Sequence, residues 1–271
     1  MHILASCNQG IVCCHRRCGG RHRYFVAKPA TKQWKSLPDP EIRHHRRITH
    51  AIKVLSSCPL HYKIVRLSSR LGCGQSGITR CEIFDSKVWR WKEVQGLQLY
   101  PGENIRRNVP AVCDGYCIFW VTTDDNAVAF DETRESFDYF PLPQPVRRNE
   151  AYTFMQLKEY QRKCGLVCLA KDACDLELWL IEGRDSLSRK WVKKMVVNLK
   201  GLGEIKLDNR CSLGFYNAEI IHIKSCEKFI FYKLQDFSFS YVELPRGLCC
   251  ADEVFEFRSD LEPMNLRMRI E

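Results

Sequence analysis

Cysteines and histidines crowd together near the start of the sequence, where their side chains could bind a metal ion. Cys13, Cys14, His15, Cys18 and His22 lie within ten residues of one another. Thiolate and imidazole are ligands that zinc prefers. The stretch contains no Cys-x-x-Cys pair, and along a strand Cys13 and Cys14 would point to opposite faces. We therefore expect core or surface thiols here and no metal site.

The same part of the chain is strongly basic, which suits the binding of phosphate. Residues 1–70 hold 14 Lys and Arg against Asp39 and Glu41, whereas the other 201 residues hold 28 basic and 30 acidic groups. The run RHHRR at 43–47 could join the arginines nearer the N-terminus in one patch. These are Arg16, Arg17, Arg21 and Arg23. Few aromatic residues interleave with the run, so we expect a solvated basic surface and no nucleic-acid partner.

Three carboxylates stand in similar surroundings and could be read as a hydrolytic group. They are Asp131 and Glu132 in FDETRESF, and Asp85 in IFDSKVW. An Asp at the start of a turn accepts hydrogen bonds from the backbone of that turn, which explains the similar surroundings without catalysis. The sequence has no nucleophile elbow, phosphate-binding loop or HExxH motif. We therefore predict no catalytic residue, no cofactor and no enzyme.

Short apolar runs between turn residues fill most of the chain, which is typical of β-strands. Examples are residues 62–67, 116–122 and 176–181. The best helical candidate, residues 154–163, lacks a sustained helical stripe. Many of the 16 cysteines, such as Cys13, Cys14, Cys117 and Cys168, lie inside such apolar runs, where reduced thiols serve as small hydrophobic groups. The pattern predicts an all-β fold.

No part of the sequence predicts export or a membrane span. The longest apolar runs fall far short of the about 18 residues that a membrane helix needs. The first residues, MHILASCNQG, lack a basic leader followed by an apolar core. We therefore expect an intracellular protein of the cytoplasm or nucleus, with no membrane partner.

An apolar run, a polar turn and an aromatic residue recur five times along the chain. The aromatic residues are spaced by 57, 49, 51 and 50 residues. They are Trp34, Trp91, Phe140, Trp191 and Tyr241. Glycines accompany four of the units, namely Gly10, Gly115, Gly165 and Gly214. A period of about 50 residues with three or four strands per unit predicts a kelch-like β-propeller of five or six blades.

The period also predicts the bounds of the units within a single domain, 1–271. The units lie near residues 1–40, 60–96, 110–145, 163–200 and 211–246, and residues 252–264 could supply a closing strand. We interpret Trp34, Trp91 and Trp191 as packing wedges between blades. Residues 41–61 are read as an insertion that explains the 57-residue spacing. Because loops on a rigid scaffold carry binding, we expect recognition at 41–61, 70–80, 101–110 and 145–162.

Several stretches together resemble the F-box-associated domain of plant F-box proteins. They include SCNQGIVCC (6–14), FVAKPATKQWKSLP (25–38), AVAFDETRESFDYFPLP (127–143) and FEFRSDLEPM (255–264), and the resemblance spans nearly the whole chain in the family's order. In that family an F-box helix bundle docks on the Skp-type adaptor of a cullin ubiquitin ligase. A kelch-like β domain then captures the protein to be ubiquitinated.

The resemblance implies a protein-binding domain that recognises substrates for an SCF ubiquitin ligase. Its implied partners are a target protein, the Skp-type adaptor and a cullin. The F-box should precede residue 6 by some tens of residues, and five residues stand there, so we expect a chain without an F-box. Two alternatives stay open: a stand-alone interaction propeller or degenerate F-box protein without adaptor binding, and a propeller glycosidase, which would need carboxylates grouped at its central channel.

Overall fold

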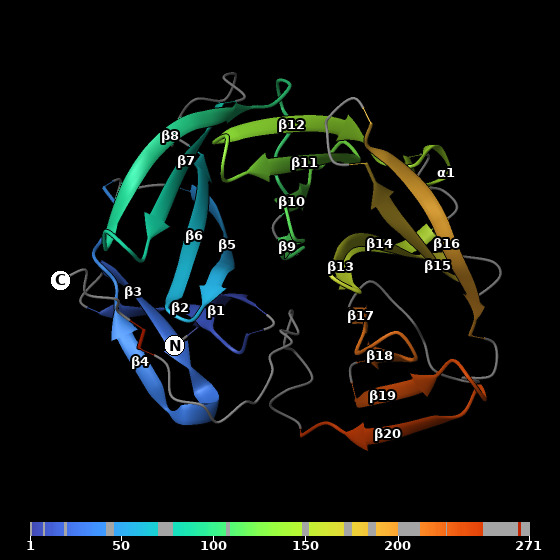
Figure 1. Ribbon diagram of the computed structural model, residues 1–271. Helices are drawn as coiled ribbons and strands as arrows, with labels where there is room; N and C mark the ends of the chain where they lie inside the picture. Colours follow the sequence, from blue (N-terminus) through green and yellow to red (C-terminus); the bar gives the residue numbers. More distant parts are fainter. Residues whose placement is uncertain are drawn as a thin grey trace. The chain divides into compact units, whose positions relative to one another are not determined.

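The apolar runs fold into β-strands throughout the part of the chain that the computed structural model describes (Figure 1). The described residues are 2–7, 9–18, 21–41, 46–69, 78–106, 109–147, 152–170, 175–183, 188–199, 212–225, 227–245 and 265–266. The strands form five four-stranded sheets. Sheet 1 contains β1 (His2–Ser6), β2 (Val12–Cys18), β3 (Arg21–Lys28) and β4 (Gln33–Ser36). Sheet 2 contains β5 (Arg46–Ser57), β6 (Leu60–Ser69), β7 (Ile78–Asp85) and β8 (Arg90–Gln98). Sheet 3 contains β9 (Val112–Cys113), β10 (Cys117–Val121), β11 (Asn126–Asp131) and β12 (Ser136–Pro141). Sheet 4 contains β13 (Tyr152–Tyr160), β14 (Lys163–Ala170), β15 (Asp175–Glu182) and β16 (Lys190–Asn198). Sheet 5 contains β17 (Ser212–Phe215), β18 (Ile220–Lys224), β19 (Lys228–Lys233) and β20 (Phe239–Glu243). A 3-10 turn (Pro29–Thr31) and a short helix α1 (Gln144–Arg147) complete the described elements.

Within each sheet the strands lie in chain order, each beside the next. In sheets 1, 2, 4 and 5 the neighbouring strands are antiparallel. Four-stranded meanders repeated along a chain are the blades of a β-propeller. The prediction of an all-β propeller is therefore confirmed, with five blades in the described residues. The predicted closing strand at 252–264 lies outside them.

Two of the predicted unit bounds are wrong, because sheets 2 and 4 each have a first strand that precedes the predicted start of the unit. Sheet 2 begins at Arg46 and sheet 4 at Tyr152, where the units were expected near 60 and 163. Residues 41–61 are thus not an insertion, and 154–163 is mostly the strand β13. Both strands bury polar side chains, among them Lys53 and Lys158, so they lack the apolar run by which a strand is recognised.

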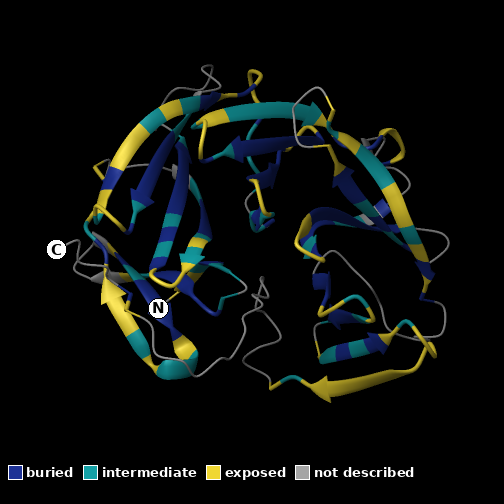
Figure 2. Cartoon of the chain, viewed as in Figure 1, coloured by how far each residue is buried: buried dark blue, intermediate teal, exposed yellow. Residues whose placement is uncertain are grey.

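The contacts within the chain group its residues into two compact units. Unit 1 is Met1–Cys113, Asp131–Phe137 and Phe255–Glu271, and unit 2 is Asp114–Phe130 and Asp138–Val254. Each has its own hydrophobic core. In unit 2 this core lies between sheets 4 and 5, and in unit 1 between sheets 1 and 2. Figure 2 shows exposure concentrated on the fourth strands, such as β4 and β20.

The fourth-strand tryptophans show how sheets pack within a unit. All five aromatic landmarks lie in fourth strands. Trp91 is only 5% exposed, packs on Tyr24 and Phe84, and donates its indole N–H to the Pro38 carbonyl at 2.8 Å. In unit 2, Trp191 is half-buried and donates in the same way to Pro141 at 3.0 Å. The wedge prediction is confirmed for Trp91, and Trp191 makes the equivalent contact.

The wedge prediction is wrong for Trp34. Its position in the sheet is that of Trp91, because it pairs with Ala27 as Trp91 pairs with Phe84. Its side chain is nevertheless 67% exposed. The repeat predicts the strand in which each tryptophan lies and its register in the sheet. The indole is buried, however, only where a neighbouring sheet covers it, as sheet 1 covers Trp91.

The glycines do not mark one repeated position. Gly10 and Gly115 lie in the turns before β2 and β10, whereas Gly165 lies within β14 and Gly214 within β17. At Gly214 a Cβ atom would lie 2.6 Å from the ring of His222, so the glycine allows this histidine to pack across the strand. The even spacing of the last three glycines is therefore coincidental.

The end of the chain belongs to unit 1. Leu266 is 6% exposed and is part of the core between sheets 1 and 2. The Tyr62 hydroxyl donates to the Leu266 carbonyl at 3.0 Å. Leu266 therefore packs between the first two sheets and is held there by a hydrogen bond from Tyr62.

Among the described residues, no helix is long and apolar enough to cross a membrane.

Candidate protein-recognition surface

The cysteines near the N-terminus are buried thiols of sheet 1. Cys13 and Cys14 are fully buried neighbours on β2 and therefore face opposite sides of the sheet. Burial raises the pKa of both thiols, which keeps them neutral. The side chains of Cys18 and His22 lie outside the described residues, as do residues 43–45 of the basic run. Within the described part of the chain, no three His, Cys, Asp or Glu side chains are grouped to hold a metal ion.

Asp85 and Asp131 cap equivalent turns, as predicted. The Asp85 Oδ1 atom accepts the backbone N–H of Lys87 at 2.8 Å, and the Asp131 Oδ1 atom accepts that of Thr133 at 2.8 Å. Both turns end in a non-glycine residue with left-handed backbone geometry, at φ 55° and 52°. These residues are Trp89 and Glu135. The two aspartates therefore have a local, structural role.

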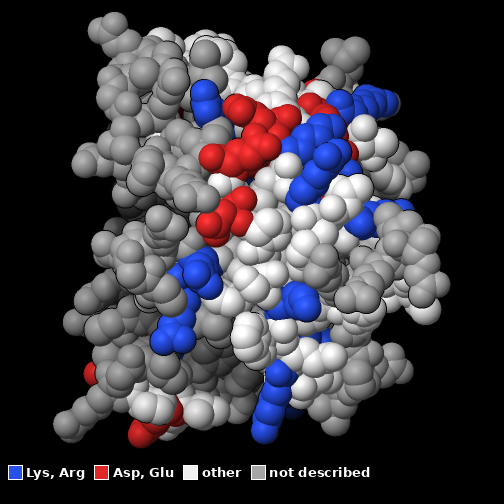
Figure 3. All heavy atoms as spheres, turned by 90° about the vertical axis from the view of Figure 1, so that its left-hand side faces the viewer, with Lys and Arg blue, Asp and Glu red and all other residues white. Residues whose placement is uncertain are grey.

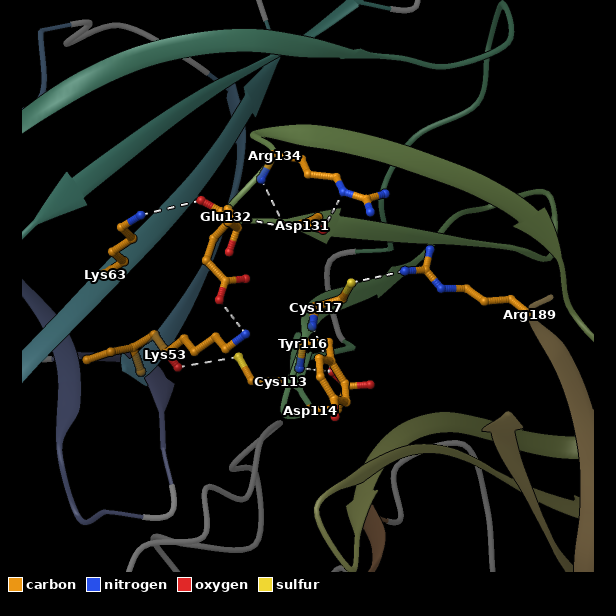
Figure 4. A network of polar contacts seen from close by, with 12 residues as sticks. Lys53, Lys63, Cys113, Asp114, Tyr116, Cys117, Asp131, Glu132, Arg134 and Arg189 are labelled. Atoms are coloured by element: carbon orange, nitrogen blue, oxygen red, sulfur yellow. Dashed lines mark hydrogen bonds and ion pairs between the residues drawn. The ribbon is translucent and has the colours of Figure 1, made fainter. Parts of the chain in front are cut away.

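Glu132 has a role that the sequence did not reveal. Its carboxylate lies 2.6 Å from the Lys53 ammonium group, and both side chains are about as buried as the core. Its backbone carbonyl accepts a hydrogen bond from Lys63 at 3.4 Å (Figure 4). Lys53 and Lys63 are direct cross-strand partners on β5 and β6, so their like charges would repel without the glutamate. Glu132 therefore compensates charge inside unit 1.

These contacts fix three hairpin tips of unit 1 to one another. The tip between β5 and β6 is tied to the tip between β7 and β8, because Tyr62 and Ser86 exchange hydrogen bonds at 2.9 and 3.1 Å. His61 Nε2 lies 3.1 Å from Asp85 Oδ1 across the same two hairpins. Lys92 forms an ion pair with Glu135 at 2.7 Å, which ties β8 to the tip between β11 and β12. These hydrogen bonds and ion pairs therefore connect the three tips.

The exposed side chains of these tips are the candidate recognition surface. We call Leu55, Pro59, Lys87, Val88 and Arg134 the tip surface. Val88 is 54% exposed and Leu55 39% exposed, and the side chain of Arg134 is 71% exposed. Exposed apolar and basic side chains occur together in protein interfaces. Since the backbone beneath is held in place, this surface suits the binding of another protein.

The loops predicted to bind a partner are only partly described. Residues 46–57 and 60–61 of the first, and 152–160 of the last, are strands, so the expectation that these two stretches are loops is wrong for most of their length. Residues 70–77 and 107–108 lie outside the described residues. In an antiparallel meander the β6–β7 link is at the opposite end of the sheet from the β5–β6 and β7–β8 tips. Of the predicted stretches, 41–61 contributes Leu55 and Pro59 to the tip surface, whereas Lys87, Val88 and Arg134 lie outside all four.

A buried arginine links sheets 3 and 4 within unit 2. The Arg189 side chain is 4% exposed and forms an ion pair with Asp138 at 2.5 Å. It also donates to the Cys117 sulfur at 3.1 Å (Figure 4). The guanidinium lies 5.9 and 6.0 Å from the ring centres of Phe119 and Phe140. Because its charge is paired and stacked, Arg189 serves packing.

The surface charge of the described residues is mixed where it can be seen. On the face shown in Figure 3, acidic and basic side chains lie next to one another beside an uncharged area. On sheet 2, for example, Arg80 lies 3.6 Å from Glu93. The described side chains visible on this face form no continuous basic track of the kind that nucleic-acid channels carry.

Comparison with known proteins identifies the family that this architecture fits. Residues 1–247 match the model of the F-box associated beta propeller domain. An F-box protein of Arabidopsis thaliana is 47% identical over 45 residues, which cover 17% of this chain and 24% of that protein. The chain thus matches about a quarter of the length of this relative.

Solved structures give looser likenesses. Apo AztD from Citrobacter koseri aligns with a TM-score of 0.43 at 11% identity, covering 90% of this chain and 72% of that one. The β-propeller domain of Cps50 (Swd1) from Myceliophteria thermophila aligns with a TM-score of 0.45 at 10% identity, covering 90% of this chain and 86% of that one.

Proposed function

Because the chain belongs to the family of F-box associated β-propeller domains, we propose that it recognises the substrate of an SCF-type ubiquitin ligase. The match over residues 1–247 is the observation that carries this proposal. The domain would bind the protein to be ubiquitinated, and its partners in the complex, the Skp-type adaptor and the cullin, would bring the ubiquitin-transfer machinery. The chain itself takes no chemical step in this proposal.

The chemistry of the described side chains supports a binding role. The carboxylates that could have formed a hydrolytic group are engaged elsewhere: Asp85 and Asp131 cap turns, and Glu132 pairs with Lys53. A glycosidase needs two carboxylates facing one bond of its substrate, one of them free to donate a proton. These three are held by hydrogen bonds and an ion pair, which favours recognition over catalysis.

The cysteines support an intracellular site of action. Nine cysteines of the described residues are free thiols, and seven of them are buried or half-buried in strands. Free thiols in this number suit a reducing compartment, because an oxidising one would convert exposed thiols such as Cys58 to disulfides. We propose the cytoplasm or nucleus, where SCF ligases would meet their substrates.

Affinity purification followed by mass spectrometry tests this function. The tagged chain should recover the Skp-type adaptor, a cullin and at least one further protein, the target. The variant Val88→Asp changes the tip surface and should recover the adaptor but less of the target. A matched control, Tyr216→Asp, changes a side chain that is 65% exposed in unit 2 and should behave as the unchanged chain.

Each outcome assigns the role. Recovery of a target without adaptor or cullin would favour a stand-alone interaction domain and overturn the ligase proposal. Recovery of neither class of partner would also overturn it. Equal loss of target from both variants would show that the tip surface is not the binding surface.

A further inference from the structure

One face of sheet 1 places two arginines beside two aromatic rings. The register pairs Ile3 with Cys14, Cys14 with Phe25, Arg16 with Arg23, and Ala27 with Trp34. Residues that pair directly, and those two apart on a strand, share a face of the sheet. Ile3, Arg16, Arg23, Phe25 and Trp34 therefore lie on the same face, which we call the arginine–aromatic face.

The two arginines of this face stand directly opposite each other and are exposed. Arg16 on β2 pairs with Arg23 on β3. Neither guanidinium has a hydrogen bond or ion pair to any of the described residues. Like charges directly opposite on a sheet destabilise it, so such a pair is a cost unless an anion is bound. Two guanidinium groups side by side suit a carboxylate, which accepts paired hydrogen bonds.

The aromatic part of the face is also open to solvent. Trp34 is 67% exposed, and its ring lies 5.8 Å from that of Phe25 in an edge-on arrangement. Ile3 is 42% exposed. Exposed tryptophan next to arginine is the composition of residues that dominate protein interfaces. An apolar side chain of a partner could cover the two rings.

The spacing defines the length of the partner segment. From Arg23 to Ala27, the partner of Trp34, the chain advances four residues, or about 13 Å along the strand. An extended segment of a partner would span this length with about four residues. We propose that the arginine–aromatic face binds a short acidic segment of a partner protein, with a carboxylate at the arginine pair and an apolar side chain on Phe25 and Trp34.

Charge complementarity supports this occupant. Residues 1–70 carry a net charge of +12, while the remaining residues carry −2, so the acidic partner is drawn to this part of the chain. A nucleic acid strand would need a longer series of cations and rings than one pair of each. This inference rests on the proposed function for the identity of the partner, since the acidic segment would belong to the target. The binding of an acidic segment to this face does not itself depend on a ligase.

A peptide array tests the inference on the whole protein. The probes are immobilised peptides about ten residues long, in which an acidic pair is separated by one to six residues from a leucine or phenylalanine. Matched probes carry Asn and Gln in place of Asp and Glu. We expect binding of the acidic probes, strongest at a separation of about four residues and weaker at high salt, and at least about tenfold weaker binding of the matched probes.

Variants identify the surface that binds. The charge-reversed pair Arg16→Glu with Arg23→Glu should lose at least about tenfold in affinity, and Trp34→Ala should lose several-fold. The controls should bind as the unchanged chain. They are Arg90→Glu, an exposed arginine of β8, and Phe237→Ala, which is also 67% exposed but lies in unit 2. Circular dichroism spectra that match the unchanged chain show that the variants fold.

Three results would overturn the inference. The first is the absence of binding to any acidic probe. The second is binding that the arginine variants leave intact. The third is stronger binding of single-stranded DNA or RNA than of the peptides, which would assign the face to nucleic acid. Failure of the array together with recovery of adaptor and target would refute only this inference, whereas success of the array without adaptor would refute only the ligase proposal.

Discussion

Replacing Trp91 and Trp34 by alanine compares one position of the repeat in two environments. Trp91 is buried between sheets 1 and 2 and donates a hydrogen bond to Pro38, whereas Trp34 is 67% exposed. Loss of a large buried aromatic side chain costs about 3–5 kcal/mol. Substitution of an exposed residue changes stability by about 0.5 kcal/mol or less. The expected cost of Trp91→Ala is therefore several times that of Trp34→Ala.

Denaturant unfolding followed by circular dichroism measures this difference, with thermal unfolding as a second readout. In a chain of this size about 1 kcal/mol corresponds to ~2–4 °C in melting temperature, so Trp91→Ala should lower it by about 10 °C. Trp91→Phe separates the hydrogen bond from packing and should cost about 1–2 kcal/mol. Equal losses for Trp91→Ala and Trp34→Ala would refute the account of inter-sheet packing, because they would mean that burial does not distinguish the two positions.

Three further predictions follow from buried groups. Glu132→Gln leaves the Lys53 ammonium buried without its counter-ion and should lower the free energy of unfolding, measured with denaturant, by about 3–5 kcal/mol. Lys53→Met combined with Glu132→Leu should restore most of that loss. A cost below about 1 kcal/mol for Glu132→Gln would contradict the buried pair. Burial lowers the pKa of His50 and of His222 from 6.5 to about 3, so each stays neutral when folded but takes up a proton when unfolded below pH 6.5. The free energy of unfolding should accordingly fall by about 1.4 kcal/mol per pH unit for each histidine as the pH drops from 6.5 towards 3, and replacing either by Gln should flatten that slope. Leu266→Asp places a charge in the core of unit 1 and should lower its stability by several kcal/mol, whereas an unchanged unfolding curve would show that Leu266 does not pack in this core.

The repeated pattern of about 50 residues made most of the fold predictable from the sequence. The aromatic residues that recur about every 50 residues lie in the fourth strand of every sheet. The similar sequence surroundings of Asp85 and Asp131 indicated that they begin equivalent turns. Both signals are local, because a turn or a strand is decided by residues a few positions apart. Local patterns were therefore enough for the fold class and for the role of these two aspartates.

Contacts between residues distant in the chain could not be predicted from the sequence. Lys53 and Glu132 meet only because two hairpins distant in the chain are held together, so nothing in the residues around Glu132 indicates an ion pair. The same holds for Trp34, whose exposure depends on which sheet faces it. The strand β13 does not show as an apolar run because Gln156 and Lys158 are polar although they are buried. A strand that buries polar side chains lacks the apolar run by which strands are predicted.

The central claim, recognition of a substrate for ubiquitination, is tested most directly by measuring ubiquitin attached to the captured proteins in cells that contain or lack this chain. Quantitative mass spectrometry of ubiquitin-modified lysines, together with protein half-lives, gives the readout. We predict that at least one protein captured by the unchanged chain, and less so by Val88→Asp, loses ubiquitin and becomes longer-lived when the chain is removed. Captured proteins whose ubiquitination and half-life stay the same would contradict the claim.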